Sequence, residues 1–210
     1  MKKIVFLGPP GSGKTSLRKF FFEGVPADKI LQEPDIPTIG VKYTRFNYVY
    51  LYPIEKEGKV PEKIPMELAL MDTSGQELEK FLTTNAKERV FSQADIVLFI
   101  FDVSEWEAES RKEYLMDFIS FTNSARLELS PKSVFHVIGH KYDKYPAGKT
   151  SADMDKIKFK IKNELQDYVF KKNNKFLDFS IFLTSLKQEF RRESFQALLE
   201  LTTNLLTIPF

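Results

Sequence analysis

Apolar residues along this chain fall into short runs separated by longer amphipathic stretches. The short runs are rich in aliphatic and aromatic residues, and the run at 96–103 is continuously apolar, which is typical of a strand buried on both faces of a parallel sheet. The pattern predicts six strands, at about residues 3–7, 41–52, 66–71, 96–103, 134–139 and 178–183.

The stretches between these runs carry helix signals. Gly24 is of the residue type that often ends a helix, Ser104 with Glu107 matches a capping box, and Thr150 with Asp153 resembles another helix start. The predicted helices cover about residues 14–24, 77–92, 105–128, 150–172 and 187–206.

Two connections lack an apolar period. Residues 25–37 contain prolines and are expected to form a loop, and the charged segment 53–65 is expected to be an extended hairpin turn. Strands that alternate with helices predict an α/β fold, a three-layer α/β/α sandwich around a six-stranded, mostly parallel sheet with one antiparallel edge strand. No internal repeat or domain boundary is visible, so residues 1–210 are expected to form a single domain.

The composition narrows the possible functions. The 210 residues are 42% hydrophobic and 29% charged, typical of a globular protein, and the net charge of +2 gives no reason to expect nucleic-acid binding. Without cysteine, the chain has no disulfide, no thiolate zinc site and no prenyl or palmitoyl anchor. No signal peptide or bilayer-spanning run is recognised, so a cytoplasmic protein without an intrinsic membrane anchor is expected.

The segment Gly8–Thr15 follows the first predicted strand and fits the pattern G-x-x-x-x-G-K-[ST] of a phosphate-binding loop (P-loop). Glycines let backbone N–H groups turn inward around a phosphate, and the following helix adds the positive end of its dipole. Lys14 is expected to reach the terminal phosphates, and the Thr15 hydroxyl to ligate Mg²⁺. The motif predicts the nucleoside triphosphate site of a P-loop NTPase.

The turn after the third predicted strand, residues 72–77, reads Asp-Thr-Ser-Gly-Gln-Glu. Ligands bind outside the carboxyl ends of strands in parallel sheets, so this turn is expected to face the same site. The Asp72 carboxylate can hold Mg²⁺ directly or through water, the Gly75 N–H can reach a γ-phosphate, and Gln76 can orient an attacking water. The alternative is a structural turn with an aspartate cap.

The turns after the fifth and sixth predicted strands are 140–143 (His-Lys-Tyr-Asp) and 184–186 (Thr-Ser-Leu). One carboxylate can accept two hydrogen bonds from the guanine edge, and adenine offers neither donor, so Asp143 would favour guanine by about 1–3 kcal/mol or more. The Lys141 stem can cover a face of the base, and N–H groups of 184–186 can meet the guanine O6. Taken alone, charged loops of this kind are common on protein surfaces.

In this order the motifs resemble those of a Ras-superfamily small GTPase, and they extend over nearly the whole chain. Within the superfamily, His-Lys-x-Asp in place of Asn-Lys-x-Asp is characteristic of the Rag/Gtr branch. The resemblance is carried by Gly8–Thr15, Thr38 in Pro37–Gly40, Asp72–Gln76, His140–Asp143 and Thr184–Leu186, and also by 101–104 (Phe-Asp-Val-Ser), 182–185 (Phe-Leu-Thr-Ser) and 193–197 (Glu-Ser-Phe-Gln-Ala).

The resemblance implies a G domain that binds GTP and GDP with Mg²⁺, hydrolyses GTP slowly and orders two switch loops on the γ-phosphate. Lys14 and Gln76 would be catalytic, acting on the β/γ-phosphates and on the attacking water. Thr15 and Thr38 would ligate Mg²⁺, with Asp72 completing the metal site. The implied nucleotide-binding residues are Pro10, Gly11, Ser12, Gly13, Lys14, Thr15, Ser16, Thr38, Gly75, His140, Lys141, Asp143, Ser185 and Leu186.

The chain departs from the family pattern in several places. Pro10 stands where Ras has a glycine close to the catalytic glutamine, and Leu31 stands roughly where Ras has an aromatic against the base. His140 replaces an asparagine that ties the base loop to the phosphate loop, which predicts looser nucleotide binding. Rag/Gtr proteins carry a second, dimerising domain after the G domain, whereas this chain ends at Phe210. A divergent relative, archaeal for example, would show such departures.

The leading hypothesis is a GTP-hydrolysing molecular switch that signals to effectors and is regulated by activating (GAP) and exchange (GEF) proteins. A homodimer, a heterodimer with another GTPase, or a complex with a roadblock-type protein is also expected, and partners would recruit the chain to a membrane. Two alternatives stay open. One is a nucleotide-locked scaffold in which Pro10 blocks Gln76. The other is an adenine-nucleotide enzyme, because the same P-loop residues also open many ATPases and nucleotide kinases.

Overall fold

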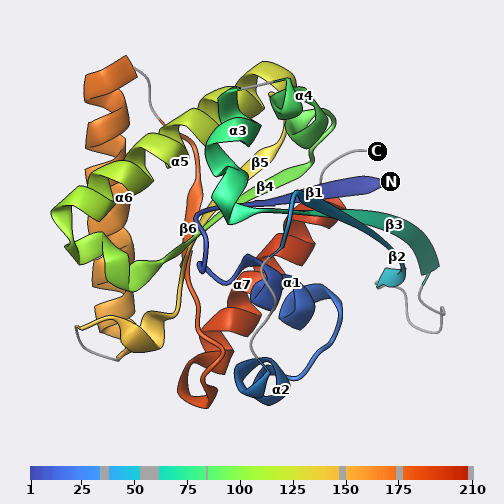
Figure 1. The fold of residues 1–210 in the computed structure, drawn as a ribbon. Coiled ribbons are helices and arrows are strands. Elements are labelled where there is room, and N and C mark those ends of the chain that lie inside the picture. Colours follow the sequence, from blue (N-terminus) through green and yellow to red (C-terminus); the bar gives the residue numbers. More distant parts are fainter. Residues whose placement is uncertain (34–37, 53–61, 84, 147–149, 174–176, 208–210) are drawn as a thin grey trace.

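In the computed structural model, a six-stranded sheet runs through the molecule with helices on both of its faces (Figure 1). The strand order is β2-β3-β1-β4-β5-β6. The strands are β1 (Lys2–Leu7), β2 (Val41–Tyr52), β3 (Glu62–Thr73), β4 (Ile96–Asp102), β5 (Val134–His140) and β6 (Ser180–Leu183). The structure describes residues 1–33, 38–52, 62–83, 85–146, 150–173 and 177–207.

The sheet is parallel except at one edge. β1 pairs in parallel with β3 on one side and with β4 on the other, and β5 and β6 continue the parallel part. β2 pairs antiparallel with β3 along its whole length, from Val41 opposite Thr73 to Tyr52 opposite Glu62. The central strand β1 is buried along its whole length and β4 up to Asp102, because both of their faces are covered. The predicted mostly parallel sheet with an antiparallel edge strand is confirmed.

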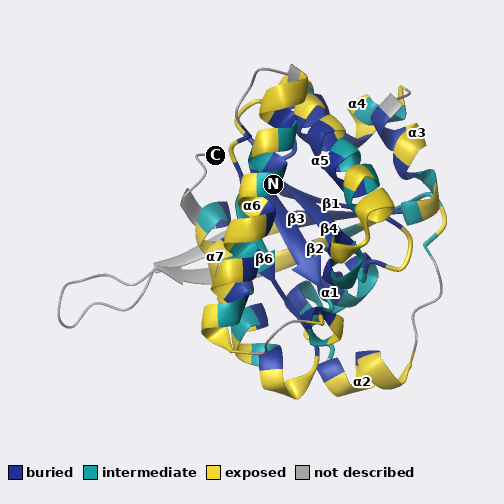
Figure 2. Ribbon diagram, turned by 90° about the vertical axis from the view of Figure 1, so that its left-hand side faces the viewer, coloured by how far each residue is buried: buried dark blue, intermediate teal, exposed yellow. Residues whose placement is uncertain are grey.

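Alternate side chains of the strands enter two separate cores, as the period of two in a strand requires. In β4, Val97 and Phe99 enter the first core, and Leu98 and Ile100 enter the second core. Figure 2 shows the buried residues along the strands and the exposed residues on the outer sides of the helices. Helices packed on the first core are α3 (Leu78–Thr83), α4 (Ala86–Phe91), α5 (Glu109–Leu129) and α6 (Ser151–Asn173); those on the second are α1 (Lys14–Phe22), α2 (Ala27–Gln32) and α7 (Arg191–Thr207).

Local signals account for two helix boundaries. α1 ends at Phe22, and Gly24 follows with a left-handed φ of 66°, a conformation that stops a helix. At the start of α6, Thr150 N–H donates to the Asp153 carboxylate and Asp153 N–H donates to Thr150 Oγ1, each at 3.2 Å. This reciprocal pair is a capping box, and it lies at the helix start that the sequence predicts.

Several predicted elements differ from the structure. The loop predicted at 25–37 contains α2, because Ala27 and Ile30 bury themselves in the second core and tertiary packing outweighs the prolines on either side. The helix predicted at 77–92 is two short helices, α3 and α4, which follow a 3₁₀ turn at Gly75–Glu77. Each of these short helices buries its own apolar residues in the first core.

The helix start predicted at Ser104 is also displaced. Asp102 acts as the cap instead, since its Oδ1 accepts a hydrogen bond from Ser104 N–H at 3.1 Å. A 3₁₀ turn follows over Val103–Glu107, and α5 begins at Glu109. The strand predicted at 66–71 is longer: β3 covers Glu62–Thr73, so the last four residues of the hairpin turn predicted at 53–65 belong to the strand, and residues 53–61 lie outside the described part of the chain.

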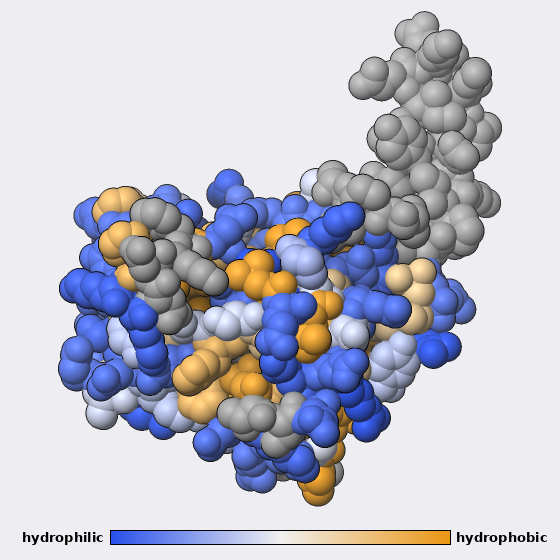
Figure 3. All heavy atoms as spheres, turned by 90° about the horizontal axis from the view of Figure 1, so that it is seen from above, coloured by the Kyte–Doolittle hydropathy of each residue, from blue (hydrophilic) through white to orange (hydrophobic). Residues whose placement is uncertain are grey.

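Two observations concern the surface. Within the ranges given above, no helix combines the length and apolar character needed to cross a membrane. On the face shown in Figure 3, hydrophobic residues form groups bordered by hydrophilic ones.

Candidate functional site

A cavity of about 350 Å³ opens at the edge of the sheet where β1 and β3 end. Because these two strands are parallel neighbours, the loop after Leu7 and the turn after Thr73 emerge side by side. The lining also includes residues of α1, α2 and the segments before β2 and after β5. The lining residues are Pro10, Gly11, Gly13, Lys14, Thr15, Ser16, Ile30, Thr38, Thr73, Ser74, Gly75, Gln76 and Lys141.

The loop after β1 is shaped for an anion. Its backbone turns through positive φ values at Gly8, Gly11 and Gly13. α1 begins at Lys14, and its N-cap Gly13 provides no side-chain hydrogen bond. The positive end of the helix dipole therefore points at this loop and adds a favourable potential for a bound anion.

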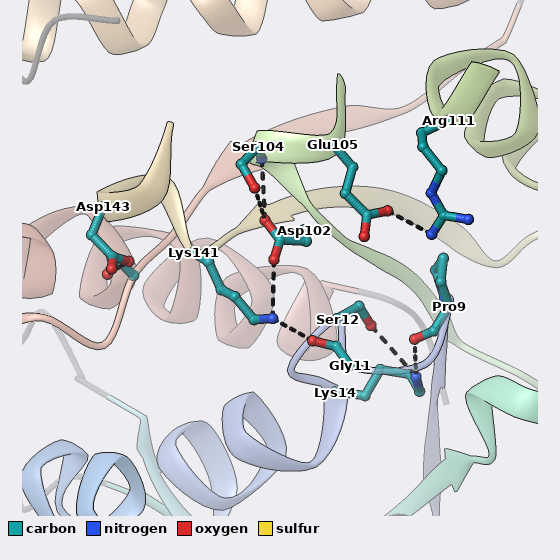
Figure 4. Close-up of polar contacts among 11 residues, drawn as sticks. Pro9, Gly11, Ser12, Lys14, Asp102, Ser104, Glu105, Arg111, Lys141 and Asp143 are labelled. Atoms are coloured by element: carbon teal, nitrogen blue, oxygen red, sulfur yellow. Dashed lines mark hydrogen bonds and ion pairs between the residues drawn. The ribbon is translucent and has the colours of Figure 1, made fainter. Parts of the chain in front are cut away.

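Lys14 lies across this loop. Its Nζ donates to the carbonyl oxygens of Gly8 at 3.0 Å and Pro9 at 2.8 Å, and it lies 3.4 Å from Ser12 Oγ (Figure 4). Burial lowers the pKa of Lys14 to about 8, and the charge of Lys141 acts in the same direction although nearby Asp72 opposes both. A phosphate in the cavity would supply the negative charge that favours the protonated amine.

Asp72, at the end of β3, connects α1 to the segment before β2. Its buried Oδ2 accepts hydrogen bonds from Thr15 Oγ1 at 2.8 Å and from Arg18 Nε at 3.2 Å. The Thr15 hydroxyl in turn lies 3.1 Å from the Thr38 hydroxyl. The other carboxylate oxygen of Asp72, Oδ1, is buried and has no hydrogen-bond partner within the described part of the chain.

The donors gathered here suit a hard cation that shares its ligands with a phosphate. The oxygens of Thr15, Thr38 and Asp72 are the ligand type that Mg²⁺ prefers. Within the described ranges, no group of three or more histidine, cysteine, aspartate or glutamate residues could hold a metal ion. Phosphate oxygens would have to complete the coordination, as is usual for Mg²⁺ at nucleotide sites.

The turn after β3 touches both the phosphate loop and the segment before β2. Gly75 packs so closely on the loop that a Cβ would lie 2.4 Å from Pro10 N, a backbone atom that has little room to yield. Ser74 N–H donates to the Gly40 carbonyl at 2.7 Å. Gln76 is exposed and lines the cavity. The two segments that are expected to act as switches are therefore hydrogen-bonded to each other.

Lys141 spans from the turn after β5 to the phosphate loop. Its Nζ donates to the Gly11 carbonyl and to Asp102 Oδ2, the latter at 3.0 Å (Figure 4). The Asp102 carboxylate is held from its other side by Ser104 N–H at 3.1 Å and Ser104 Oγ at 2.7 Å. Partial burial alone would raise the pKa of Asp102, but the hydrogen bonds from Ser104 and Lys141 lower it below its usual value.

His140 joins the same turn to two other loops. Its Nδ1 lies 2.9 Å from Thr184 Oγ1, and its ring packs so tightly beneath the phosphate loop that a Cβ at Gly13 would lie 2.4 Å from the ring Cδ2. Burial lowers the pKa of His140 to about 4, so the ring is neutral at pH 7. The imidazole thus contacts the phosphate loop from the position where an Asn-Lys-x-Asp motif has its asparagine.

Asp143 and the turn after β6 lie beside Lys141 but do not line the cavity. Asp143 Oδ1 accepts a hydrogen bond from Ser185 Oγ at 2.6 Å. The Ser185 N–H, expected to face a guanine, donates instead to Ser194 Oγ at 3.1 Å, so Ser185 contributes through its hydroxyl. The Leu186 side chain is buried in the second core, which leaves only its backbone for a ligand.

Three residues near the site were not predicted from the sequence. Arg18 and Asp102 contact site residues, and Ile30 lines the cavity, whereas the neighbouring Leu31, expected near a base, is exposed. The spacing of Arg18, three residues after Thr15 and thus on the same helix face, is the one local signal for its position. Asp102 and Ile30 carry no such signal.

Comparison with known proteins agrees with this arrangement. A GTP-binding protein, gtr1, of Schizosaccharomyces pombe is 27% identical over 146 residues, which are 68% of this chain and 40% of the yeast protein. A structure of Roco2 RocCORdC from Methanosarcina barkeri, solved with GDP bound, shares the fold, with a TM-score of 0.54 at 17% identity over 98% of this chain and 49% of that one. The chain thus spans less than half the length of either relative.

The chain also matches a protein family. Residues 3–192 match the conserved region of the Gtr1/RagA G proteins, which includes the phosphate loop, the turn after β3 and the turns after β5 and β6. A match of this extent covers nearly every element that positions the cavity. The chain therefore belongs to the Gtr1/RagA G protein family.

Proposed function

We propose that this chain is a guanine-nucleotide switch that binds GTP and GDP with Mg²⁺ and hydrolyses GTP to GDP and phosphate. The observation that carries the proposal is the convergence of Lys14, Thr15 and Thr38 on one cavity at the ends of β1 and β3, where Asp72 of a third segment accepts a hydrogen bond from Thr15. Membership of the Gtr1/RagA family and the names of the relatives, one GTP-binding and one bound to GDP, support guanine nucleotides as the ligands.

The phosphates of the nucleotide would occupy the cavity. The Lys14 ammonium and the positive end of the α1 dipole would attract them, with Ser12 and Ser16 beside them. Thr15 and Thr38 would ligate Mg²⁺ through their hydroxyls, and the unpartnered Oδ1 of Asp72 would hold it through a water. When bound, Mg²⁺ neutralises charge on the β- and γ-phosphates.

Hydrolysis would use Gln76 to orient a water towards the γ-phosphorus. The water oxygen forms the new bond, the bond from the γ-phosphorus to the bridging oxygen breaks, and the proton of the water passes to the released phosphate. No arginine lines the cavity among the described residues, so charge at the bridging oxygen has no arginine donor in this chain. We therefore expect slow turnover that an activating partner accelerates by supplying such a group.

Guanine would be selected by the turns after β5 and β6. Asp143 has one oxygen held by Ser185 Oγ, and its carboxylate can accept from the guanine N1 and N2 groups. Lys141, fixed between Gly11 and Asp102, presents its hydrocarbon stem to the base. His140 fixes the position of both residues by packing beneath the phosphate loop.

The switch itself would be the pair of segments around Thr38 and Gly75. They are joined by the hydrogen bond from Ser74 N–H to the Gly40 carbonyl, so a γ-phosphate that orders one segment would also order the other. Effectors, GAPs and GEFs would recognise this surface. A second GTPase or a roadblock-type protein would serve as a dimer partner and would bring the chain to a membrane.

One observation favours a second candidate, a nucleotide-locked scaffold that does not cycle. Gly75 packs on the Pro9–Pro10 backbone, and Pro10 and Gln76 both line the cavity. A Gln76→Leu variant decides between the candidates. It should lower single-turnover GTP hydrolysis at least tenfold if the chain is an enzyme, and should change nothing if it is a scaffold.

The experiment that tests the nucleotide is calorimetry of the nucleotide-free protein with GTP, GDP and ATP in the presence of Mg²⁺. We expect binding of GTP and GDP at least 100-fold tighter than binding of ATP, and loss of this preference in Asp143→Asn. Asp155→Asn, an exposed carboxylate of α6 changed in the same way, is the matched control. Equal binding of ATP and GTP by the wild-type protein would refute the proposal.

A further inference from the structure

The buried side chain of Arg18 lies next to the candidate magnesium site, and the function proposed above assigns it no role. Arg18 of α1 has no exposed side-chain surface, and its guanidinium is paired with Asp72, also fully buried, and with Glu23. Burying a guanidinium is costly even when it is paired, and neighbouring positions of α1 bury apolar residues such as Leu17 and Phe21 instead. The contacts of Arg18 therefore need an explanation beyond core packing.

Arg18 holds one particular oxygen of Asp72. Thr15 and Arg18 are three residues apart on α1, so both side chains reach the end of β3 from one helix face. Both donate to the same atom, Asp72 Oδ2, at 2.8 Å and 3.2 Å. Two donors on Oδ2 leave Oδ1 as the free oxygen, and Oδ1 is the buried atom that has no partner among the described residues.

The charges around Arg18 indicate that it orients the Asp72 carboxylate and does not repel a bound metal cation. Its guanidinium lies between the carboxylates of Glu23 and Asp72, so the group of three carries one net negative charge. The positive charge of Arg18 is thus neutralised by these carboxylates even without a bound metal cation. What remains specific to arginine is the direction of its Nε–H, which restrains rotation of the Asp72 carboxylate.

We propose that Arg18 is a positioning residue for the magnesium–nucleotide site, which fixes Asp72 so that Oδ1 faces the cation position. The contacts Glu23–Arg18–Asp72–Thr15–Thr38 form a continuous path from the end of α1 to the segment before β2. Loss of Arg18 would let the carboxylate rotate and would weaken the coupling between Mg²⁺ and the bound nucleotide. The inference rests on the proposed function, because it concerns the same cation.

The test measures release of a fluorescent GDP analogue from the full chain as a function of Mg²⁺ concentration. Arg18→Met removes the donor, and Arg18→Lys keeps the charge but loses the directed Nε–H. Lys19→Met, the same loss of charge one residue along α1, is the control. We expect the Mg²⁺ concentration that half-maximally slows release to rise about 10–100-fold in Arg18→Met. Arg18→Lys should shift in the same direction, and Lys19→Met should match wild type.

Each outcome decides the matter. If the Mg²⁺ midpoint of the folded Arg18 variants stays within threefold of wild type while only their melting temperature falls, Arg18 is structural and the inference is wrong. A lower Mg²⁺ midpoint would show repulsion and would also overturn it. If Arg18→Met does not fold, Arg18→Lys decides. If the wild-type protein fails to bind the analogue, or releases it independently of Mg²⁺, the proposed function itself fails.

Discussion

Acid should destabilise this protein through two buried histidines. His136 and His140 are the only histidines of the chain, both lie on β5, and burial lowers the pKa of each to about 4. Each ring is held by a neutral partner. His136 Nε2 lies 3.1 Å from Asn204 Nδ2, and His140 Nδ1 lies 2.9 Å from Thr184 Oγ1.

The size of the effect follows from the two pKa values. In the unfolded chain both rings take up a proton near pH 6.5, whereas in the folded protein they do so only near pH 4. The unfolded state therefore binds more protons between these values, and stability falls as the pH falls through this range. The free energy of unfolding falls by about 2 kcal/mol per histidine between pH 7 and pH 5, and by about 3 kcal/mol once the pH is below 4.

The assay is urea unfolding followed by circular dichroism at pH 7, 6 and 5. His136→Gln and His140→Asn place an amide near the ring nitrogen that makes each hydrogen bond, and neither amide titrates. Between pH 7 and 5, the free energy of unfolding of each variant should fall by about 2 kcal/mol less than that of wild type. This difference corresponds to roughly 1 M in the urea midpoint. The double variant should lose about 4 kcal/mol less than wild type.

The comparison with the double variant removes the contribution of the carboxylates, which are present in every variant. If wild type and the double variant lose equal stability between pH 7 and 5, the histidines do not take up protons on unfolding, and the prediction is wrong. Between pH 7.5 and 8.5 all variants should show the same pH dependence, because the rings are neutral in both states.

Other predictions concern the site. Because the pKa of ligand-free Lys14 is about 8 and phosphate binds the protonated amine, affinity for GDP should fall about tenfold per pH unit above 8, with proton uptake visible by calorimetry in buffers of different ionisation enthalpy; a flat profile to pH 9.5 would contradict this. Gly75→Ala should weaken the binding of GTP at least tenfold and change the binding of GDP little, because its Cβ would lie 2.4 Å from Pro10 N. Competition binding measures both affinities, and equal effects on the two nucleotides would contradict a role at the γ-phosphate. Asp102→Asn should speed release of GTP and GDP alike by about tenfold, since Lys141 loses a charged partner; release at the wild-type rate would mean that the Gly11 carbonyl alone holds Lys141.

Much of the fold and the position of the candidate site followed from local sequence patterns. Strand β4 was recognisable because a strand covered on both faces must be apolar throughout. The site was recognisable because the loop after β1 needs glycines and a lysine at set positions. The family resemblance is likewise carried by short segments, and it is confirmed by the match over residues 3–192.

The tertiary structure decided contacts that join distant segments. In the sequence, Arg18 is one of several basic residues in predicted helices. Only the parallel pairing of β1 with β3 brings Asp72 Oδ2 to 3.2 Å from its Nε. Helix α2 forms because Ile30 packs into the second core. The free energy of this packing is not part of the local helix propensity. His140 replaces the asparagine of the Asn-Lys-x-Asp motif, and its ring packs against Gly13 because β5 and the phosphate loop lie side by side. The sequence by itself thus determined the elements and the nucleotide motifs, because these depend on neighbouring residues. The partners of the buried charges depend on packing across the sheet, so only the tertiary structure decided them.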